Sequence, residues 1–147
     1  VEKPAHLLAS STQTKHLYQQ AYKQARKYQY TITIGYITIT NWQELMFRFN
    51  KKIMDEVAKN IAILINDNLH EFDHAGLIID GEYLFIYPHQ NKKEANVKLT
   101  KLVEALKVRF FANLGEFSVN IAFSIATPSA QDIDPYIFLS RLSEIKK

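Results

Sequence analysis

Apolar residues recur at the spacing of an amphipathic α-helix in four stretches of this chain. The stretches cover residues 12–28, 41–69, 92–111 and 134–147. Ser11 or Thr12 is expected to cap the first helix, and Asn41 the second, where Glu44 follows at the spacing of a capping box. The residues expected to be buried are Leu17, Ala21, Ala25 and Tyr28, then Leu45, Phe49, Ile53, Val57, Ile61, Leu64 and Ile65, then Ala95, Leu99, Leu102, Leu106 and Phe110, and finally Phe138, Leu142 and Ile145.

Three segments have the alternation or the β-branched composition of strands. They are residues 30–40, where threonine and isoleucine alternate, residues 75–88, and residues 117–125. Asp80 and Gly81 divide the second segment, and this pair is typical of a type I′ hairpin turn, which needs two positive φ angles. Asp134 and Pro135 are expected to begin the last helix. The order predicts an α+β fold with a ferredoxin-like β-α-β-β-α-β core, in which two helices pack on one face of an antiparallel sheet.

The composition fits one globular domain, because 47% of the 147 residues are hydrophobic. The chain has no cysteine, which excludes a disulfide framework and a cysteine-based zinc site. No apolar run approaches the ~18–20 residues of a membrane span, so no membrane contact is expected in this segment. The net charge of +3 is spread over mixed helix faces, so no nucleic-acid partner is expected. The stretch closest to a basic aromatic patch contains Tyr22, Arg26, Lys27, Tyr28 and Tyr30, and it is better explained as the end of an amphipathic helix.

The two ends of the chain suggest a piece of a longer protein. It begins at Val1 rather than at methionine, and it ends on Lys146 and Lys147 directly after an amphipathic stretch. We expect residues 1–11 to be a linker from an upstream region and residues 12–147 to be the domain.

The residues around the hairpin carry a resemblance to a known family. His70-Glu-Phe-Asp73 precedes Ile79-Asp80-Gly81-Glu82-Tyr83 at the spacing of Arg-x-x-Asp and Gly-Gly-Asp/Glu-Glu-Phe in the GGDEF domain, the diguanylate cyclase fold. The apolar strand that ends at Pro88 and the strand over residues 119–126 are similar to strands of that family. The first strand and the helix after it also align without a gap. The resemblance covers nearly the whole chain.

The resemblance also implies what a cyclase would need and what this chain lacks. Members of the family join two GTP molecules, with metal ions held by carboxylates on the triphosphate. The position of the first metal carboxylate is Thr38 here and that of the signature carboxylate is Gly81, so Glu82 alone is retained. Ile79 and Asp80 replace the glycines that let the backbone approach the phosphates. We expect no metal site and no catalytic residue, with Glu82 either a surviving nucleotide or metal contact or a solvent-facing hairpin residue.

The positions for nucleotide recognition are changed as well. The resemblance places the guanine-reading pair at Met46 and Asp55, and Asp55 either still reads a guanine edge or lies on a wet helix face. His70 replaces the arginine of the inhibitory site and cannot form its bidentate fork. Asp73 remains, either as a ligand contact or as a residue that caps the loop before the hairpin. His70 and His74 would suit zinc only with a third ligand, which is not evident.

We interpret the chain as a catalytically inactive GGDEF-like module of a larger bacterial cyclic di-GMP signalling protein, in the cytoplasm or on the cytoplasmic side of a membrane-anchored protein. It would act through a protein partner or by self-dimerisation, beside a phosphodiesterase (EAL) domain or a sensor domain. The alternative is an allosteric domain that senses GTP with Mg²⁺ as a non-hydrolysed effector through Asp55 and Glu82, and otherwise no cofactor is expected. Phe47 lies off the apolar face of its helix, where it either contacts a partner or fills the unused nucleotide pocket.

Overall fold

The computed structural model describes residues 8–114 and 119–146. Its elements are α1 (Ser11–Lys27), β1 (Ile32–Ile39), α2 (Trp42–Arg48), α3 (Lys51–Asn68), β2 (His74–Ile79), β3 (Glu82–Pro88), α4 (Lys92–Leu114), β4 (Ile121–Ala126), α5 (Pro135–Leu142) and the 3-10 turn η1 (Ser143–Lys146). The predicted order of elements is confirmed, except that the second predicted helix is two helices. None of the described helices has the length and the apolar character that crossing a bilayer requires.

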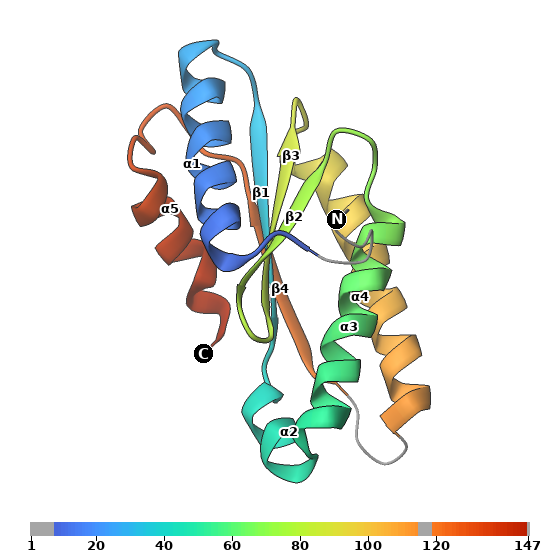
Figure 1. Cartoon of the computed structure of the whole chain (residues 1–147). Helices are drawn as coiled ribbons and strands as arrows, with labels where there is room; N and C mark the ends of the chain where they lie inside the picture. The colour runs from blue at the N-terminus through green and yellow to red at the C-terminus, as the bar shows by residue number, and fades with distance from the viewer. Residues whose placement is uncertain (1–7, 115–118, 147) are drawn as a thin grey trace, which may run out of the picture.

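The four strands form one antiparallel sheet in the order β2-β3-β1-β4. Helices α3 and α4 cover one face of this sheet, and α1 and α5 cover the other (Figure 1). The predicted α+β fold, with two helices on one face of an antiparallel sheet, is therefore confirmed. The predicted burial of Phe110 and Ile145, and the predicted strand start at Phe117, lie outside the described side chains and residues.

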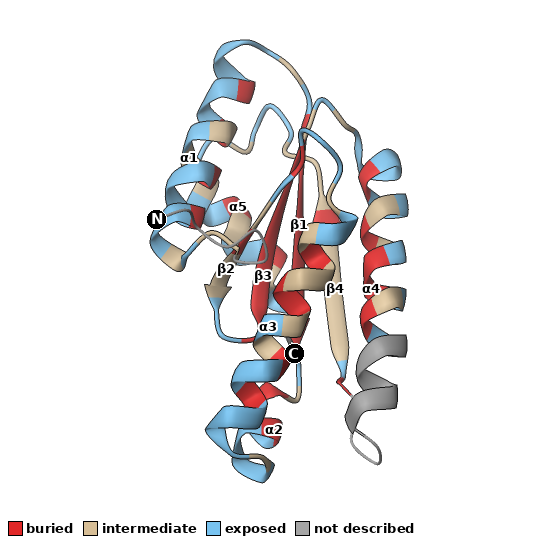
Figure 2. Ribbon diagram, turned by 45° about the vertical axis from the view of Figure 1, so that its right-hand side comes forward, coloured by how far each residue is buried: buried red, intermediate tan, exposed pale blue. Residues whose placement is uncertain are grey.

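Strand β1 is buried along its whole length because helices cover both faces of the sheet (Figure 2). Ile37 packs in the core beneath α3 and α4, whereas Ile34 packs in the core beneath α1 and α5. The buried Thr33 hydroxyl bonds to the Gln90 carbonyl at 2.6 Å and to the Thr127 hydroxyl at 2.7 Å. A run of alternating threonine and isoleucine therefore suits a strand that has no wet face.

Helix α1 is capped by Ser10 and not by Ser11 or Thr12, because Ser10 and Gln13 form a reciprocal capping box. Its buried residues are Thr14, Tyr18, Tyr22 and Ala25, whereas Leu17 and Tyr28 of the predicted apolar face are 38% and 65% exposed. The Tyr18 hydroxyl donates to the carbonyl of Pro135 at the start of α5. Tyrosines can be buried on this face because the start of α5 and the loop before it supply acceptors for the hydroxyl groups of Tyr18 and Tyr22.

The predicted helix over residues 41–69 is broken between α2 and α3. Phe49 adopts extended backbone, and the side chain of Asn50 accepts from the amide of Ile53 at 2.9 Å, which starts a new helix. The break rotates the buried face, so Met54 is buried and Ile53 is 40% exposed. A single periodic stripe could not reveal this break, because both halves keep the same spacing.

The caps of the other helices gave mixed outcomes. The side chain of Asn41 makes no cap bond to α2 and instead accepts from the amide of Asn120 at 2.9 Å, so the predicted capping box with Glu44 is wrong. Asp134 caps α5 with Pro135 in the first turn, as predicted.

The residues before α1 lie against the sheet. Ala9 forms an isolated parallel bridge with Gly76, and its carbonyl accepts from the amide of Leu77 at 3.1 Å. A side chain at Gly76 would meet the Thr14 hydroxyl at 2.0 Å, so α1 crosses β2 in direct contact with its backbone. This entry of the chain places residues 8–10 beside the hairpin.

Candidate functional site

The β2–β3 hairpin turns at Asp80 and Gly81, as predicted. Only Gly81 of the pair has a positive φ, at 84°, so the predicted type I′ geometry is wrong. The register shifts between Leu77 and Ile79, and Ile79 pairs with Glu82. A bulge of this kind leaves one extra residue on β2 and increases the local twist of the hairpin.

Trp42 lies directly on this turn. A Cβ atom added to Gly81 would stand 2.8 Å from the Cγ atom of Trp42, which is closer than real contacts allow. Trp42 is the single tryptophan of the chain and is only 6% exposed. The indole therefore occupies the space that a side chain at the signature carboxylate position would need.

Thr38 and Glu82 face each other across β1 and β3. They are 4% and 9% exposed, so the expectation that Glu82 faces solvent is wrong. β3 runs between β1 and β2, and its first residue is covered from both sides. A small cavity of about 160 Å³ adjoins the pair, below the ~300 Å³ at which small-molecule sites begin. Its lining residues are Thr38, Ile39, Thr40, Trp42, Gln43, Ile79, Asp80 and Glu82.

The acidic residues of this cavity are Asp80 and Glu82. Two-metal chemistry on a triphosphate requires more oxygen ligands than two carboxylates supply. Within residues 8–114 and 119–146, no three histidine, cysteine, aspartate or glutamate side chains are grouped to hold a metal, and this includes His70 and His74. The residues present do not fit the metal pair that the resemblance implies.

A second cavity of about 290 Å³ lies on the other side of Trp42, between α3, the hairpin and residues 8–10. Asp55 and Lys59 are polar residues of its lining, whereas Leu8, Ala58, Ala62, Leu77 and Tyr83 are apolar or aromatic. Burial, with Asp80 as a smaller contribution, raises the pKa of Tyr83, so its hydroxyl stays protonated. The buried Nε1 atom of Trp42 has no hydrogen-bond partner among the described residues. This cavity therefore combines an apolar wall with the charged side chains of Asp55, Lys59 and Asp80.

Asp73 and His70 do not meet these cavities. Asp73 is 7% exposed, and its carboxylate accepts from Gln90 Nε2 at 2.7 Å and from Lys98 Nζ at 3.0 Å. The carbonyl of His70 accepts from the amide of Asp73 at 3.0 Å, while the side chain of His70 is exposed. Asp73 thus ties the loop before β2 to Gln90, just before α4, and to Lys98 on α4.

Phe47 is 94% exposed, so the expectation that it fills the nucleotide pocket is wrong. Its neighbour Met46 is 46% exposed, and neither residue lines the two cavities beside the hairpin. Trp42 lines both of those cavities instead. Sequence reasoning missed this role of Trp42. The signals available were the single tryptophan of the chain and the glycine at the hairpin turn, and only the structure shows that they are in contact.

Comparisons with known proteins place the fold. No protein-family model matches the chain, and no curated protein matches it. Among solved structures, the GGDEF domain of DgcB from Caulobacter crescentus, in complex with c-di-GMP, superposes with a TM-score of 0.82 at 14% identity, over 99% of this chain and 90% of that one. The GGDEF domain of FimX from Pseudomonas aeruginosa gives a TM-score of 0.84 at 16% identity, over 99% and 90% of the two chains.

A third similar structure contains a bound protein. The diguanylate cyclase SiaD from Pseudomonas aeruginosa, in complex with its activator SiaC, gives a TM-score of 0.79 at 13% identity, over 99% of this chain and 56% of that one. Matches at this level of identity establish a common fold. The chain therefore has the fold of GGDEF domains.

Proposed function

We propose that this chain is a catalytically inactive GGDEF-like module of a bacterial cyclic di-GMP signalling protein, and that it acts through protein contacts. The observation that carries the loss of catalysis is the buried pair of Thr38 and Glu82 beside Gly81. Joining two nucleotides needs several carboxylates around the triphosphate, whereas the described residues of this cavity supply two. The indole of Trp42 supports the proposal because it leaves no room for a side chain at Gly81.

The proposed role is regulatory, beside a phosphodiesterase (EAL) or sensor domain in a cytoplasmic segment of the protein. A domain without catalysis can still pass a signal if it dimerises or docks. The structure of SiaD, which shares this fold, is a complex with its activator SiaC. That complex supports the expectation that this fold can present a surface to a protein partner.

The surface that we assign to this contact lies at the junction of α2 and α3. Met46, Phe47 and Ile53 are 46%, 94% and 40% exposed there. Helix α2 lies beyond the end of the sheet (Figure 1), and Met46 and Phe47 are not among its buried residues, which are Trp42 and Leu45. Exposed aromatic side chains are frequent anchors of protein interfaces, because they bury a large apolar area with little loss of conformational freedom.

A matched pair of substitutions tests this surface. Phe47→Ser is expected to weaken self-association or partner binding of the full-length protein at least tenfold, measured by sedimentation velocity over a concentration series. Phe72→Ser is the control, because Phe72 is also exposed, at 73%, but lies beyond the opposite end of α3. Equal effects of the two substitutions, or no effect of either, would remove the assignment of this surface.

A calorimetric titration tests the loss of catalysis. The purified chain is titrated with GTP and with cyclic di-GMP in the presence of Mg²⁺, and each mixture is examined for product. The proposal expects no turnover of GTP under any condition tested. Formation of cyclic di-GMP would refute it.

A second candidate function is nucleotide sensing, in which GTP binds without turnover and acts as an effector. The 290 Å³ cavity favours it, because the carboxylate of Asp55 stands in its lining beside an apolar wall. Micromolar GTP binding that Asp55→Ala abolishes and Glu56→Ala preserves would support this function over a purely scaffolding one. Glu56 is a suitable control because it is an exposed acid next to Asp55 on α3 and lies outside the cavity.

A further inference from the structure

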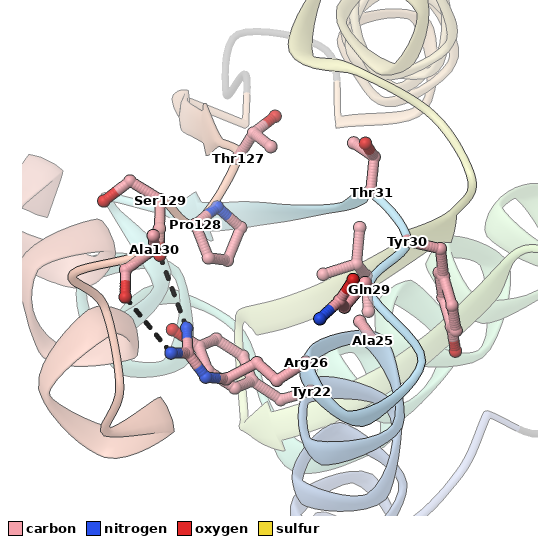
Figure 3. Close-up of a pocket in the computed structure, with 11 residues that line it drawn as sticks. Tyr22, Ala25, Arg26, Gln29, Tyr30, Thr31, Thr127, Pro128, Ser129 and Ala130 are labelled. Carbon is pink, nitrogen blue, oxygen red and sulfur yellow. Dashed lines mark hydrogen bonds between the residues drawn. The ribbon is translucent and has the colours of Figure 1, made fainter.

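A larger cavity of about 470 Å³ lies at the opposite end of β1 from Thr38 (Figure 3). Its walls come from the end of α1, the start of β1 and residues 127–130 after β4. This volume is within the ~300–1,000 Å³ that is usual for small-molecule sites. It is also larger than either cavity beside the hairpin.

The apolar part of this cavity is held in place by hydrogen bonds outside it. Tyr22 and Ile32 are buried core residues, and Pro128 faces them from the segment after β4. The Tyr22 hydroxyl donates to the carbonyl of Asp132, which fixes the ring against the loop. The Thr127 hydroxyl is bonded to the Thr33 hydroxyl at 2.7 Å. Because the hydroxyl groups of Tyr22 and Thr127 already have their hydrogen-bond partners, the cavity is formed without a ligand.

Arg26 is the one fully charged side chain of the lining. Its guanidinium donates to the carbonyls of Ser129 and Ala130 at 3.4 and 3.1 Å (Figure 3) and to the carbonyl of Asp132 at 3.1 Å. Carbonyl oxygens fix the position of a guanidinium but do not neutralise its charge. Three of its five N–H donors are used in these bonds, which leaves two for another acceptor.

No carboxylate compensates this charge within the described part of the chain. The nearest acid by contact is Asp132, but its carboxylate accepts from the amide and hydroxyl of Ser129, at 2.8 and 3.0 Å, and from Arg141. These bonds, the backbone bond from Ser129 first, hold the pKa of Asp132 below its usual range. Arg26 therefore presents a fixed positive charge at the cavity that its surroundings leave unmatched.

Gln29 supplies a second polar group. Its φ of 56° is that of the left-handed residue that ends a helix, because the amide of Tyr30 donates to the carbonyl of Ala25 at 3.0 Å and closes α1. The side chain extends from the end of α1 toward the loop that contains Pro128 (Figure 3). Gln29 lines the cavity beside Arg26.

We propose that this cavity binds a small organic anion, whose apolar or planar body lies against Tyr22 and Pro128 and whose carboxylate or phosphate pairs with Arg26. The charge selects an anion because the lining contains no acid. The apolar wall selects an organic anion over an inorganic one. This site is distinct from both cavities at the hairpin.

The test is an amide-resolved NMR titration of the chain with four probes, namely benzoate, phenyl phosphate, neutral benzamide and inorganic phosphate. Saturable shifts are expected for benzoate and phenyl phosphate at Gln29, Thr31 and Thr127. Benzamide has the same ring without the charge and is expected to bind at least tenfold more weakly, as is inorganic phosphate without the ring. Which of benzoate and phenyl phosphate binds more tightly distinguishes a carboxylate ligand from a phosphate ester.

Two substitutions of Arg26 separate its charge from its structural role. Arg26→Gln removes the charge and is expected to lower benzoate affinity at least tenfold, whereas Arg26→Lys keeps the charge but not the planar fork of donors and is expected to lower it less. Ala130→Phe provides an independent check, because it fills the cavity from an exposed position and leaves Arg26 in place. Absence of saturable shifts, equal binding of benzamide, or benzoate binding unchanged in both Arg26→Gln and Ala130→Phe would overturn the proposal.

Discussion

Replacing Gly81 with alanine tests the contact that defines the hairpin site. The new Cβ atom would stand 2.8 Å from Trp42 Cγ and 3.0 Å from Trp42 Cβ, at a residue whose φ is 84°. Left-handed backbone costs a non-glycine residue about 1–2 kcal/mol, and overpacking of a filled site costs about 1–3 kcal/mol. The lower entropy of the unfolded alanine chain returns about 0.4–1 kcal/mol. The expected loss of stability is therefore about 1–4.6 kcal/mol, which lowers the Tm by roughly 2–18 °C.

Urea denaturation followed by far-ultraviolet circular dichroism measures the global loss. Because Trp42 is the only tryptophan, its fluorescence in the native state reports the displacement of the indole itself. Asp80→Ala is the matched control: it lies in the same turn, is exposed and has no positive φ, so it should change stability by less than about 0.5 kcal/mol.

A double-mutant cycle separates the two causes. In a Trp42→Phe background the smaller ring relieves the contact, so Gly81→Ala should cost about 1–2 kcal/mol less than it does beside tryptophan. The part that remains is the backbone strain. The reasoning is refuted if Gly81→Ala destabilises no more than Asp80→Ala, or if the native fluorescence of Trp42 is unchanged by the new methyl group.

Three further predictions concern other contacts. Asp73→Ala should destabilise the fold by about 1–3 kcal/mol because it removes a buried carboxylate that accepts two hydrogen bonds. Lys98→Met should destabilise it at least as much because the buried carboxylate then lacks its cation. Urea titrations that show neither loss would contradict this. Gly76→Ala should cost about 1–3 kcal/mol by pushing α1 off β2, and a Thr14→Ala background should recover part of it in thermal melts. Burial raises the pKa of Tyr18, so the stability that its neutral hydroxyl contributes is present below the ordinary tyrosine pKa of about 10 and is lost as the pH rises above it. The last part of the tyrosinate absorbance should therefore appear only together with the loss of circular dichroism, and ionisation of every tyrosine in an intact fold would show the prediction to be wrong.

Local patterns were enough to determine the elements and their order. The alternation of threonine and isoleucine before Thr40 marks a strand because side chains of a strand alternate between its two faces. Asp80 and Gly81 located the hairpin to the residue, since few residue pairs allow so short a connection. Asp134 and Pro135 located the start of α5 for a similar reason. These features depend on the chain within a few residues, and a sequence records them directly.

Contacts between distant segments decided the rest. Asn41 was expected to cap a helix, but the amide of Asn120 lies close enough to take its side chain. Tyr18 is buried in place of Leu17, and the first residue of α5, Pro135, brings it a carbonyl acceptor. No window along the chain contains both partners of such a contact, so periodicity could not have found them.

The candidate site divides in the same way. The sequence alone determined which residue types stand at Thr38, Gly81 and Glu82, and hence which carboxylates the site lacks. Only the tertiary structure decided that Glu82 is buried opposite Thr38, that Trp42 covers Gly81, and that a cavity forms beside Arg26. The physical reason is that composition is a property of each position, whereas burial, close contact and enclosed volume arise only when a strand, a helix and a loop far apart in the chain are packed together.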